Sequence, residues 1–303
     1  MRKLLLVGGT GFVGTHMAQH CSGRFDVVTS GREVDVCNPD QVESLISRVQ
    51  PDDVVHLAAI TTLKESFENP RATYDINFGG TLNILMALRT SGFAGRFLFV
   101  SSSEVYGRLS EGDLPVAEAR PVKPMSPYAV AKIAAEALSY QWSQTEQFKI
   151  VIARPFNHIG PGQSERFAIA DFGRQVAMIK LGLMEPIICV GDIDTTRDFT
   201  DVRDITDAYE RLLDLGQSGE IYNVCSGTER SVRSLIERMC QLSGISVEIK
   251  TDSQRFRASE QRRVRGNNSR IVETTGWSAL HTIDQTLKDI VDDWVVRIGS
   301  HAS

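Results

Sequence analysis

Short apolar runs recur along the first half of the chain, and each is separated from the next by a segment with the spacing of a helix. Runs closed by glycine or polar residues are typical of parallel strands buried on both faces. The alternation predicts an α/β fold, a doubly wound parallel sheet with helices on both faces. The predicted strands lie at 4–7, 26–29, 35–36, 53–57, 96–101 and 150–153, and the predicted helices at about 39–49, 69–90 and 127–144.

The chain beyond residue 154 is less regular. Residues 154–162 contain two prolines and two glycines, which predicts a rigid loop rather than a helix or strand. A helix is predicted at about 168–181. Residues 197–204 mix both charge signs densely. They are predicted as a solvated loop, although a guanidinium there can also grip a diphosphate.

The composition excludes several classes of protein. The 303 residues are 42% hydrophobic and 23% charged, and the formal net charge of -5 gives no general attraction to nucleic acid or to an anionic membrane. Five scattered cysteines without a Cys-x-x-Cys pair predict reduced thiols in a cytoplasm, with no disulfide framework and no metal site. The first apolar run is too short for a signal peptide, and no stretch approaches the ~18 apolar residues of a membrane span.

Three glycines follow the first predicted strand at a regular spacing. Gly8, Gly11 and Gly14 form Gly-x-x-Gly-x-x-Gly, with Phe12 and Val13 between the last two, and a helical run comes next. Glycine permits a tight turn and the close approach of a pyrophosphate, which then rests on the helix N-terminus. The order of strand, turn and helix predicts a site for a dinucleotide cofactor, against the alternative of a purely structural turn.

The end of the second strand bears on the choice of cofactor. An NAD-preferring site usually has an acidic residue there, whereas this chain reads Ser30-Gly31-Arg32. Arginine can pair with a 2'-phosphate, so NADP(H) is favoured, and the adjacent Glu33 leaves NAD(H) possible. A solvated arginine is the alternative interpretation.

Two further segments are predicted to contact the same cofactor. Asp35 and Val36 are expected near the adenine. Leu57, Ala58 and Ala59 end the strand at 53–57, where small side chains let a cofactor lie close.

A tyrosine and a lysine four positions apart are the candidate chemistry. Tyr128 and Lys132 fall one helical turn apart on the same face. A nearby ammonium favours the phenolate, so Lys132 is expected to lower the pKa of Tyr128 towards a useful range for acid–base catalysis. Ser102 follows the strand at 96–101, where the C-terminal ends of parallel strands bind ligands. The alternative interpretations without a catalytic role are a solvent-exposed Tyr-Lys pair and a serine that caps a helix or turn.

Together these segments resemble the extended short-chain dehydrogenase/reductase family over nearly the whole chain. The resemblance implies a Rossmann domain at 1–155, to which the chain returns near 192–225. It also implies a smaller mixed α/β nucleotide-sugar-binding domain at 156–191 and 226–303. It also implies a homodimer formed by packing the helices at 69–90 and 127–144 into a four-helix bundle. The matching segments are Gly8-x-x-Gly11-x-x-Gly14, His56-Leu57-Ala58-Ala59, Ser102, Tyr128-x-x-x-Lys132, Arg154-Pro155-Phe156-Asn157 and Arg197-Asp198-Phe199.

Within that family, four segments are similar in sequence to GDP-4-keto-6-deoxy-D-mannose reductases, which form GDP-D-rhamnose. These segments are residues 154–163, 185–188, 197–202 and 222–227. The segment Arg257-Ala258-Ser259-Glu260 resembles an Arg-Pro-x-Glu shared by GDP-mannose-processing members, with alanine in place of proline. The resemblance implies a GDP-sugar substrate and a cofactor contact at Arg154. The expected substrate-binding residues are Ser103, Asn157, Arg197, Arg257 and Glu260.

The resemblance implies NADPH-dependent reduction of a 4-keto sugar, with Tyr128 as proton donor and Ser102 and Lys132 as its partners. Glu104 leaves a second reading open, because 4,6-dehydratases carry a glutamate there as the base that takes the C5 proton. A 4-epimerase needs the same serine, tyrosine and lysine, and a reductase forming 6-deoxy-D-talose differs only in the face of the ketone that is attacked. A cofactor-sensing or scaffold protein is disfavoured, because such proteins commonly lose the tyrosine or the lysine.

Overall fold

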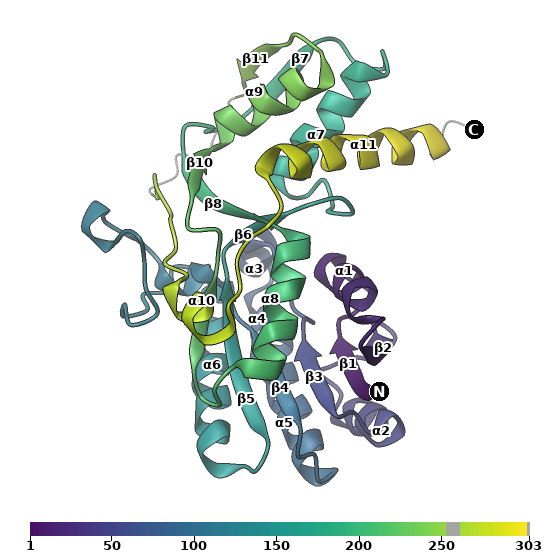
Figure 1. Cartoon of the computed structure of the whole chain (residues 1–303), viewed down its shortest axis with the longest axis vertical. Coiled ribbons are helices and arrows are strands. Elements are labelled where there is room, and N and C mark those ends of the chain that lie inside the picture. The colour runs from purple at the N-terminus through teal and green to yellow at the C-terminus, as the bar shows by residue number, and fades with distance from the viewer. Residues whose placement is uncertain (253–260, 302–303) are drawn as a thin grey trace.

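The computed structural model describes residues 1–252 and 261–301, and a six-stranded parallel sheet forms its larger part (Figure 1). The strand order is β2-β1-β3-β4-β5-β9, and every neighbouring pair in it is parallel. The predicted doubly wound parallel sheet is therefore confirmed. Its strands are β1 (Arg2–Val7), β2 (Phe25–Ser30), β3 (Asp53–His56), β4 (Arg96–Val100), β5 (Lys149–Pro155) and β9 (Ile221–Val224).

Helices cover both faces of this sheet (Figure 1), and a separate hydrophobic core lies between the sheet and the helices on each face. One core joins the sheet to α2 (Pro39–Val49), α5 (Gly80–Thr90) and α6 (Pro127–Thr145). The other joins it to α1 (Phe12–Cys21) and α8 (Val202–Leu215). Because the central strands β1, β3, β4 and β5 bury apolar side chains on both faces, the C-terminal ends of the strands are the natural place for a ligand.

The long helix predicted at 69–90 is interrupted. It consists of α4 (Pro70–Tyr74), a π-helical turn η1 (Asp75–Gly79) and α5, and is preceded by α3 (Leu63–Glu68). Asn77 lies in the π-helical turn, accepts a hydrogen bond from Ile60 N (2.8 Å) and donates one to Ile60 O (3.0 Å). The turn thus aims an amide at the loop after β3, in keeping with the frequent use of such turns at functional sites.

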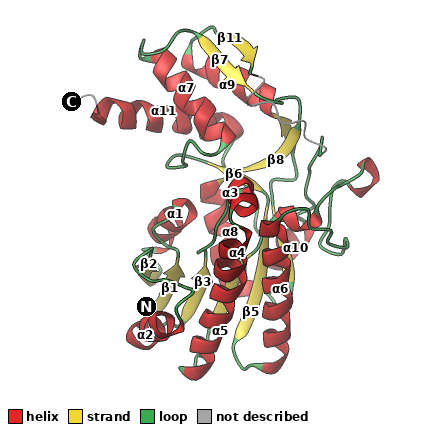
Figure 2. Ribbon diagram, turned by 180° about the vertical axis from the view of Figure 1, so that it is seen from behind, coloured by secondary structure: helices red, strands yellow, loops and turns green. Residues whose placement is uncertain are grey.

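The smaller part of the molecule lies beyond the C-terminal ends of the sheet strands (Figure 2). It contains a three-stranded sheet of order β10-β8-β6, a two-stranded sheet β11-β7, and a core shared by three helices. Its strands are β6 (Asn157–Ile159), β7 (Ile187–Val190), β8 (Thr196–Asp201), β10 (Glu229–Ser231) and β11 (Glu248–Thr251); its helices are α7 (Ala168–Lys180), α9 (Val232–Ser243) and α11 (Ile283–His301). The remaining helices are the short η2 (Ser103–Tyr106), η3 (Glu111–Asp113) and α10 (Ser269–Thr275).

Three secondary-structure predictions were wrong. Asp35 and Val36 form a turn instead of a strand, because Asp35 accepts a hydrogen bond from Cys37 N (2.9 Å) and closes the segment on itself. Residues 157–159 and 196–201 were expected in loops but form β6 and β8. These strands pair in parallel with each other, and β8 also pairs in antiparallel with β10, so both become strands because distant segments supply their hydrogen bonds.

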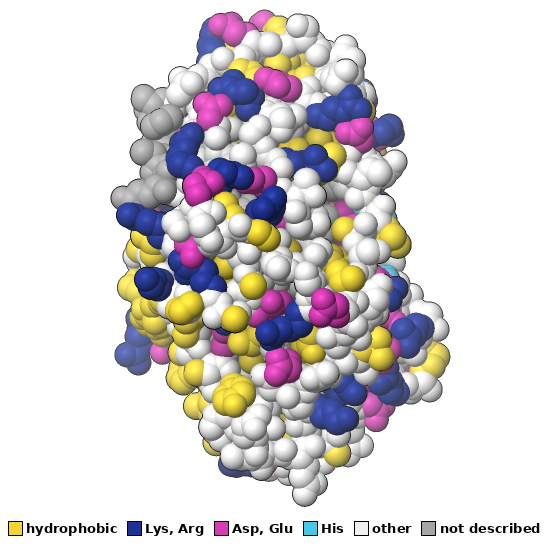
Figure 3. Space-filling view, turned by 60° about the vertical axis from the view of Figure 1, so that its left-hand side comes forward, with side chains coloured by type: hydrophobic (Ala, Val, Ile, Leu, Met, Phe, Trp, Pro, Cys, Tyr) yellow, Lys and Arg dark blue, Asp and Glu magenta, His cyan; other side chains and the backbone are white. Residues whose placement is uncertain are grey.

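The surface carries mixed charge. Lys and Arg side chains are interspersed with Asp and Glu side chains over the face in Figure 3. Across residues 1–252 and 261–301, no helix combines the length and the apolar character that a membrane crossing requires.

Candidate active site

A cleft of about 1420 Å³ lies at the C-terminal ends of the sheet strands. It is lined by the glycine-rich loop, by the ends of β2, β3 and β4, by the start of α6, and by residues 155–158 and 162–168 of the loop and strand that lead into the smaller part. Seventeen of the predicted site residues line it: Gly8, Gly11, Phe12, Val13, Gly14, Arg32, Asp35, Val36, Leu57, Ala58, Ala59, Ser102, Ser103, Glu104, Tyr128, Lys132 and Asn157.

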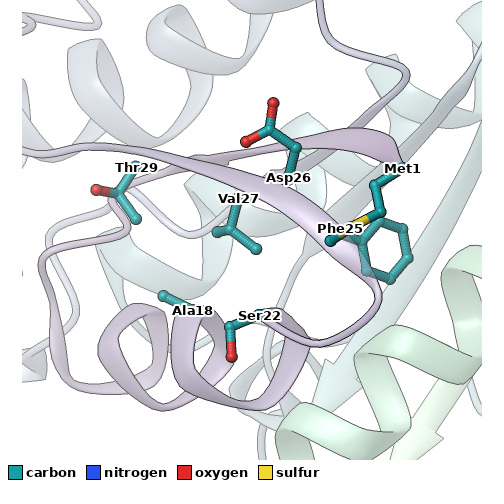
Figure 4. Close-up of a pocket in the computed structure, with 7 residues that line it drawn as sticks. All are labelled: Met1, Ala18, Ser22, Phe25, Asp26, Val27 and Thr29. Atoms are coloured by element: carbon teal, nitrogen blue, oxygen red, sulfur yellow. The ribbon is translucent and has the colours of Figure 1, made fainter.

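A second hollow, of about 550 Å³, lies between α1 and the edge strand β2 (Figure 4). Its lining residues are Met1, Ala18, Ser22, Phe25, Asp26, Val27 and Thr29, and none of them is a predicted site residue. The larger cleft is therefore the candidate site.

The glycine-rich loop can accept a pyrophosphate. A Cβ at Gly8, whose φ is +85°, would lie 2.5 Å from Ala58 N, and a Cβ at Gly14 would lie 2.5 Å from Gly9 Cα. Gly11 is the N-cap of α1 and offers no capping side chain, so the first N–H groups of the helix have no intrahelical partner. This close backbone cradle at an uncapped helix N-terminus fits the phosphates of a dinucleotide.

The adenosine end of the cleft contains both Arg32 and a carboxylate. Arg32 is exposed and lines the cleft. Glu33 turns back on the chain and accepts a hydrogen bond from Gly31 N (2.7 Å), and this bond lowers the pKa of Glu33. Arg32 thus lines the cleft, while the Glu33 carboxylate is held on the backbone N–H just after the end of β2.

The candidate chemistry lies at the opposite end. Ser126 caps α6 by accepting a hydrogen bond from Ala129 N (3.1 Å), and Pro127 is the first helical residue, so the helix begins where Tyr128 meets the cleft. Tyr128 and Ser102 are hydrogen-bonded to each other, and both side chains are nearly buried. The Lys132 ammonium lies 5.9 Å from the centre of the Tyr128 ring and donates a hydrogen bond to Val100 O (2.7 Å).

The expected direction of the Tyr128 pKa was wrong. Burial raises the pKa of Tyr128 to about 12, and the hydrogen bond from Ser102 opposes this only in part, while the charge of Glu104 adds to it. Burial also lowers the pKa of Lys132 to about 8. The phenol therefore keeps its proton at neutral pH and is suited to donate it, and the lysine is charged below about pH 8.

Glu104 lines the cleft together with Tyr128. Its side chain is accessible from the cleft, and the surrounding protein still raises its pKa by desolvation, while the charge of Arg197 opposes that shift. Arg197 is half-buried, lies outside the cleft lining and donates a hydrogen bond to Thr196 O (2.7 Å). Arg257 and Glu260, both predicted to bind substrate, lie outside the described residues.

Arg154 is not placed to contact a ligand in the cleft. Its guanidinium is buried and forms two hydrogen bonds with the Glu136 carboxylate, Nε to Oε1 (2.9 Å) and Nη2 to Oε2 (2.6 Å). The sequence reasoning had assigned Arg154 to the cofactor and had missed Glu136. The signal was present, because Glu136 lies four residues after Lys132 and therefore one turn further along the same helical face.

Comparison with known proteins agrees with this geometry. Residues 27–290 match the protein family described as GDP-mannose 4,6 dehydratase. The chain is 44% identical over 300 residues to GDP-6-deoxy-D-mannose reductase of Pseudomonas aeruginosa, covering 98% of each chain. It is 29% identical to GDP-6-deoxy-D-talose 4-dehydrogenase of Aggregatibacter actinomycetemcomitans, covering 90% of this chain and 91% of that one.

The fold agrees with solved structures. RMD from Pseudomonas aeruginosa, solved in complex with NADPH, superimposes with a TM-score of 0.94 at 44% identity, and the match covers 98% of this chain and 100% of that one. UDP-glucose 4-epimerase of Thermus thermophilus, solved with NAD, superimposes with a TM-score of 0.84 at 26% identity, covering 96% of this chain and 98% of that one.

Proposed function

Because the chain belongs to the GDP-mannose 4,6 dehydratase family, within the extended short-chain dehydrogenases/reductases, we propose that it reduces the C4 ketone of GDP-4-dehydro-6-deoxy-D-mannose to GDP-D-rhamnose with NADPH. The observation that carries this is the placement of Ser102, Tyr128 and Lys132 in the same cleft as the glycine-rich loop. A hydride donor and a ketone can meet there beside a proton donor.

The residues that line the cleft have different roles in the proposed reduction. The backbone around Gly8, Gly11 and Gly14 holds the phosphates of the cofactor, and Lys132 has ammonium hydrogens left for its nicotinamide ribose. When bound, NADPH supplies the hydride that is added to C4. Tyr128 donates its phenolic proton to the ketone oxygen, and Ser102 donates a hydrogen bond to the same oxygen. Both contacts strengthen as negative charge develops there.

Identification of the product tests the proposal. GDP-4-keto-6-deoxymannose is incubated with the enzyme and NADPH, and the product is identified by NMR. We expect GDP-D-rhamnose and one NADP+ per sugar. A product with the opposite configuration at C4 would make the enzyme a 6-deoxy-D-talose-forming reductase, and an unchanged sugar would overturn the assignment.

A 4,6-dehydratase is the second candidate, because Glu104 faces the cleft beside Tyr128 and its pKa is raised. A carboxylate in that position can act as a base towards a sugar proton. GDP-mannose with a trace of NADP+ separates the two activities. A dehydratase forms a 4-keto sugar without net use of cofactor, whereas we expect a pure reductase to leave GDP-mannose unchanged.

We expect Arg32 to determine the preference for NADPH over NADH. A guanidinium forms charge-assisted hydrogen bonds with a 2'-phosphate, and Glu33 is held away by Gly31 N. Arg32→Ala should raise the dissociation constant of NADPH about tenfold, which corresponds to about 1.4 kcal/mol, and leave that of NADH nearly unchanged. Fluorescence titration with both cofactors measures this, and an equal loss for both would contradict the role.

We propose that two chains associate through the helices around α4, α5 and α6, which lie side by side in Figures 1 and 2. Exposed apolar side chains on these helices support this, among them Tyr74, Met86, Val130 and Tyr140. Tyr140→Asp should convert a dimer into a monomer in analytical ultracentrifugation. Leu280→Asp is the control, because Leu280 is also a large exposed hydrophobic residue but lies outside these helices. A wild-type monomer would refute the interface.

We propose that the chain divides into a cofactor-binding part around the six-stranded sheet and a substrate-binding part around the two smaller sheets. Residues 1–155 and the return near 192–225 hold the cofactor, and β9 supports this by pairing with β5 in the parallel sheet, whereas β8, at the start of that return, pairs with β6 and β10 in the smaller part. Residues 156–191 and 226–303 hold the nucleotide of the GDP-sugar. The use of NADPH, and the fact that none of the five cysteines forms a disulfide bond, support a cytoplasmic location.

A further inference from the structure

A buried carboxylate lies one helical turn beyond Lys132. Glu136 is 5% exposed, and its carboxylate accepts hydrogen bonds from Ser101 Oγ (2.5 Å) and from two nitrogens of Arg154. Arg154 is 3% exposed, and its guanidinium lies 4.9 Å from the centre of the Tyr106 ring. A buried ion pair of this kind contributes little net stability compared with apolar residues of the same volume. Stability alone therefore does not explain why this ion pair is present, and a functional role is expected.

The Lys132 ammonium lies in apolar surroundings. Its Nζ donates to Val100 O and lies 5.1 Å from the centre of the Phe99 ring, and the side chain is 4% exposed. Burial penalises the charged form and lowers the pKa of Lys132, and the negative charge of Glu136 opposes this. The carboxylate thus acts on the lysine without an ion pair between them.

Other groups near Lys132 do not replace Glu136. His56 on β3 is neutral, since burial lowers its pKa to about 3. Tyr128 keeps its proton, and Glu104 on η2 acts on Tyr128. Arg154 on β5 is buried, and its guanidinium is paired with Glu136 itself. The remaining charged groups on the strand and helices packed against α6 are exposed, apart from half-buried Glu65: they are Lys64, Glu65, Glu68, Arg71, Asp75, Arg89 and Lys149.

We propose that Glu136 is a positioning residue that keeps the Lys132 ammonium charged in its buried setting, and that Arg154 holds the carboxylate in place. This rests on the proposed reduction, in which Lys132 supports proton donation by Tyr128. Glu136 reaches neither substrate nor cofactor. It acts through Lys132, and its hydrogen bond with Ser101 fastens it to the residue before Ser102.

The test removes both charges together. Glu136→Gln alone would leave Arg154 buried without a counter-ion and is expected to destabilise the fold. The double variant Glu136→Gln/Arg154→Met replaces the ion pair with neutral side chains of similar size. Ser101→Ala is the matched control, since it removes a hydrogen bond from the carboxylate but no charge.

The titration of Lys132 is read directly in the cofactor-free protein. Lysine is labelled with ¹³C at Cε, and the Lys132 signal is assigned with Lys132→Arg. We expect the titration midpoint of the double variant about one pH unit below that of the wild type, because the Glu136 carboxylate acts on the Lys132 ammonium and Arg154 is not among the groups that shift its pKa, with Ser101→Ala unchanged. The alkaline limb of kcat should shift in the same direction, because activity is lost as pH rises through the lowered pKa.

Each result decides between the possibilities. Coinciding midpoints in the wild type and the double variant would overturn the proposal, as would an equal shift in Ser101→Ala. A wild-type protein that does not reduce the 4-keto sugar would overturn the proposed function, while the NMR titration would still decide the role of Glu136.

Discussion

Replacing Tyr128 with phenylalanine should lower kcat for reduction of the 4-keto sugar about 10³-fold, within the range that a positioned general acid contributes. The change removes one oxygen, and the ring keeps its nearly buried place at the start of α6. The KM for the sugar and the dissociation constant of NADPH should change little. Because the missing contact forms mainly in the transition state, the loss should appear in kcat and kcat/KM alike.

Tyr140→Phe is the control for this variant. Tyr140 lies on the same helix, its side chain is 55% exposed, and its hydroxyl is remote from the cleft lining. Steady-state kinetics with NADPH absorbance should give wild-type values for it. Turnover within threefold of wild type in Tyr128→Phe would remove the tyrosine from its assigned role.

Gly14→Ala should raise the dissociation constant of NADPH by about 100-fold. The added Cβ would lie 2.5 Å from Gly9 Cα and 2.6 Å from Gly9 C and O, and all of these are backbone atoms that cannot rotate away. Helix α1 must therefore move from the glycine-rich loop. Overpacking of this kind costs about 1–3 kcal/mol, and the upper end corresponds to the expected loss.

Gly23→Ala is the matched control for the glycine-rich loop. A Cβ at Gly23 meets nothing within 4 Å, so NADPH affinity and the melting temperature should both stay at wild-type values. Calorimetric titration and thermal melts followed by circular dichroism separate loss of binding from loss of folding. Wild-type affinity in Gly14→Ala would mean that the cofactor does not rest on this loop.

Local signals accounted for the elements predicted correctly. Asn38 and Ser126 cap α2 and α6 with side-chain hydrogen bonds, and a proline follows each cap at the first helical position. The buried strands were recognisable in the sequence as short apolar runs. These features depend on neighbouring residues in the chain, so the sequence alone could reveal them.

The errors at β6, β8 and Arg154 share a physical cause. β6 and β8 pair His158 with Thr200, residues far apart in the chain, and neither segment has a strong pattern of its own. The same applies to Arg154, which sequence placed at the cofactor and which binds Glu136 instead. Side-chain partners on different elements are decided by packing, which local patterns do not encode.

The sequence by itself determined the parallel sheet, the glycine-rich turn and the candidate residues Ser102, Tyr128 and Lys132, because strand and helix periodicity and backbone freedom are properties of short segments. Tertiary structure alone decided the protonation states. Burial raises the pKa of Tyr128 and lowers that of Lys132, since desolvation depends on everything packed around a group. It also brought Glu136, Arg154 and Ser101 together, because three separate elements must fold before their side chains can meet.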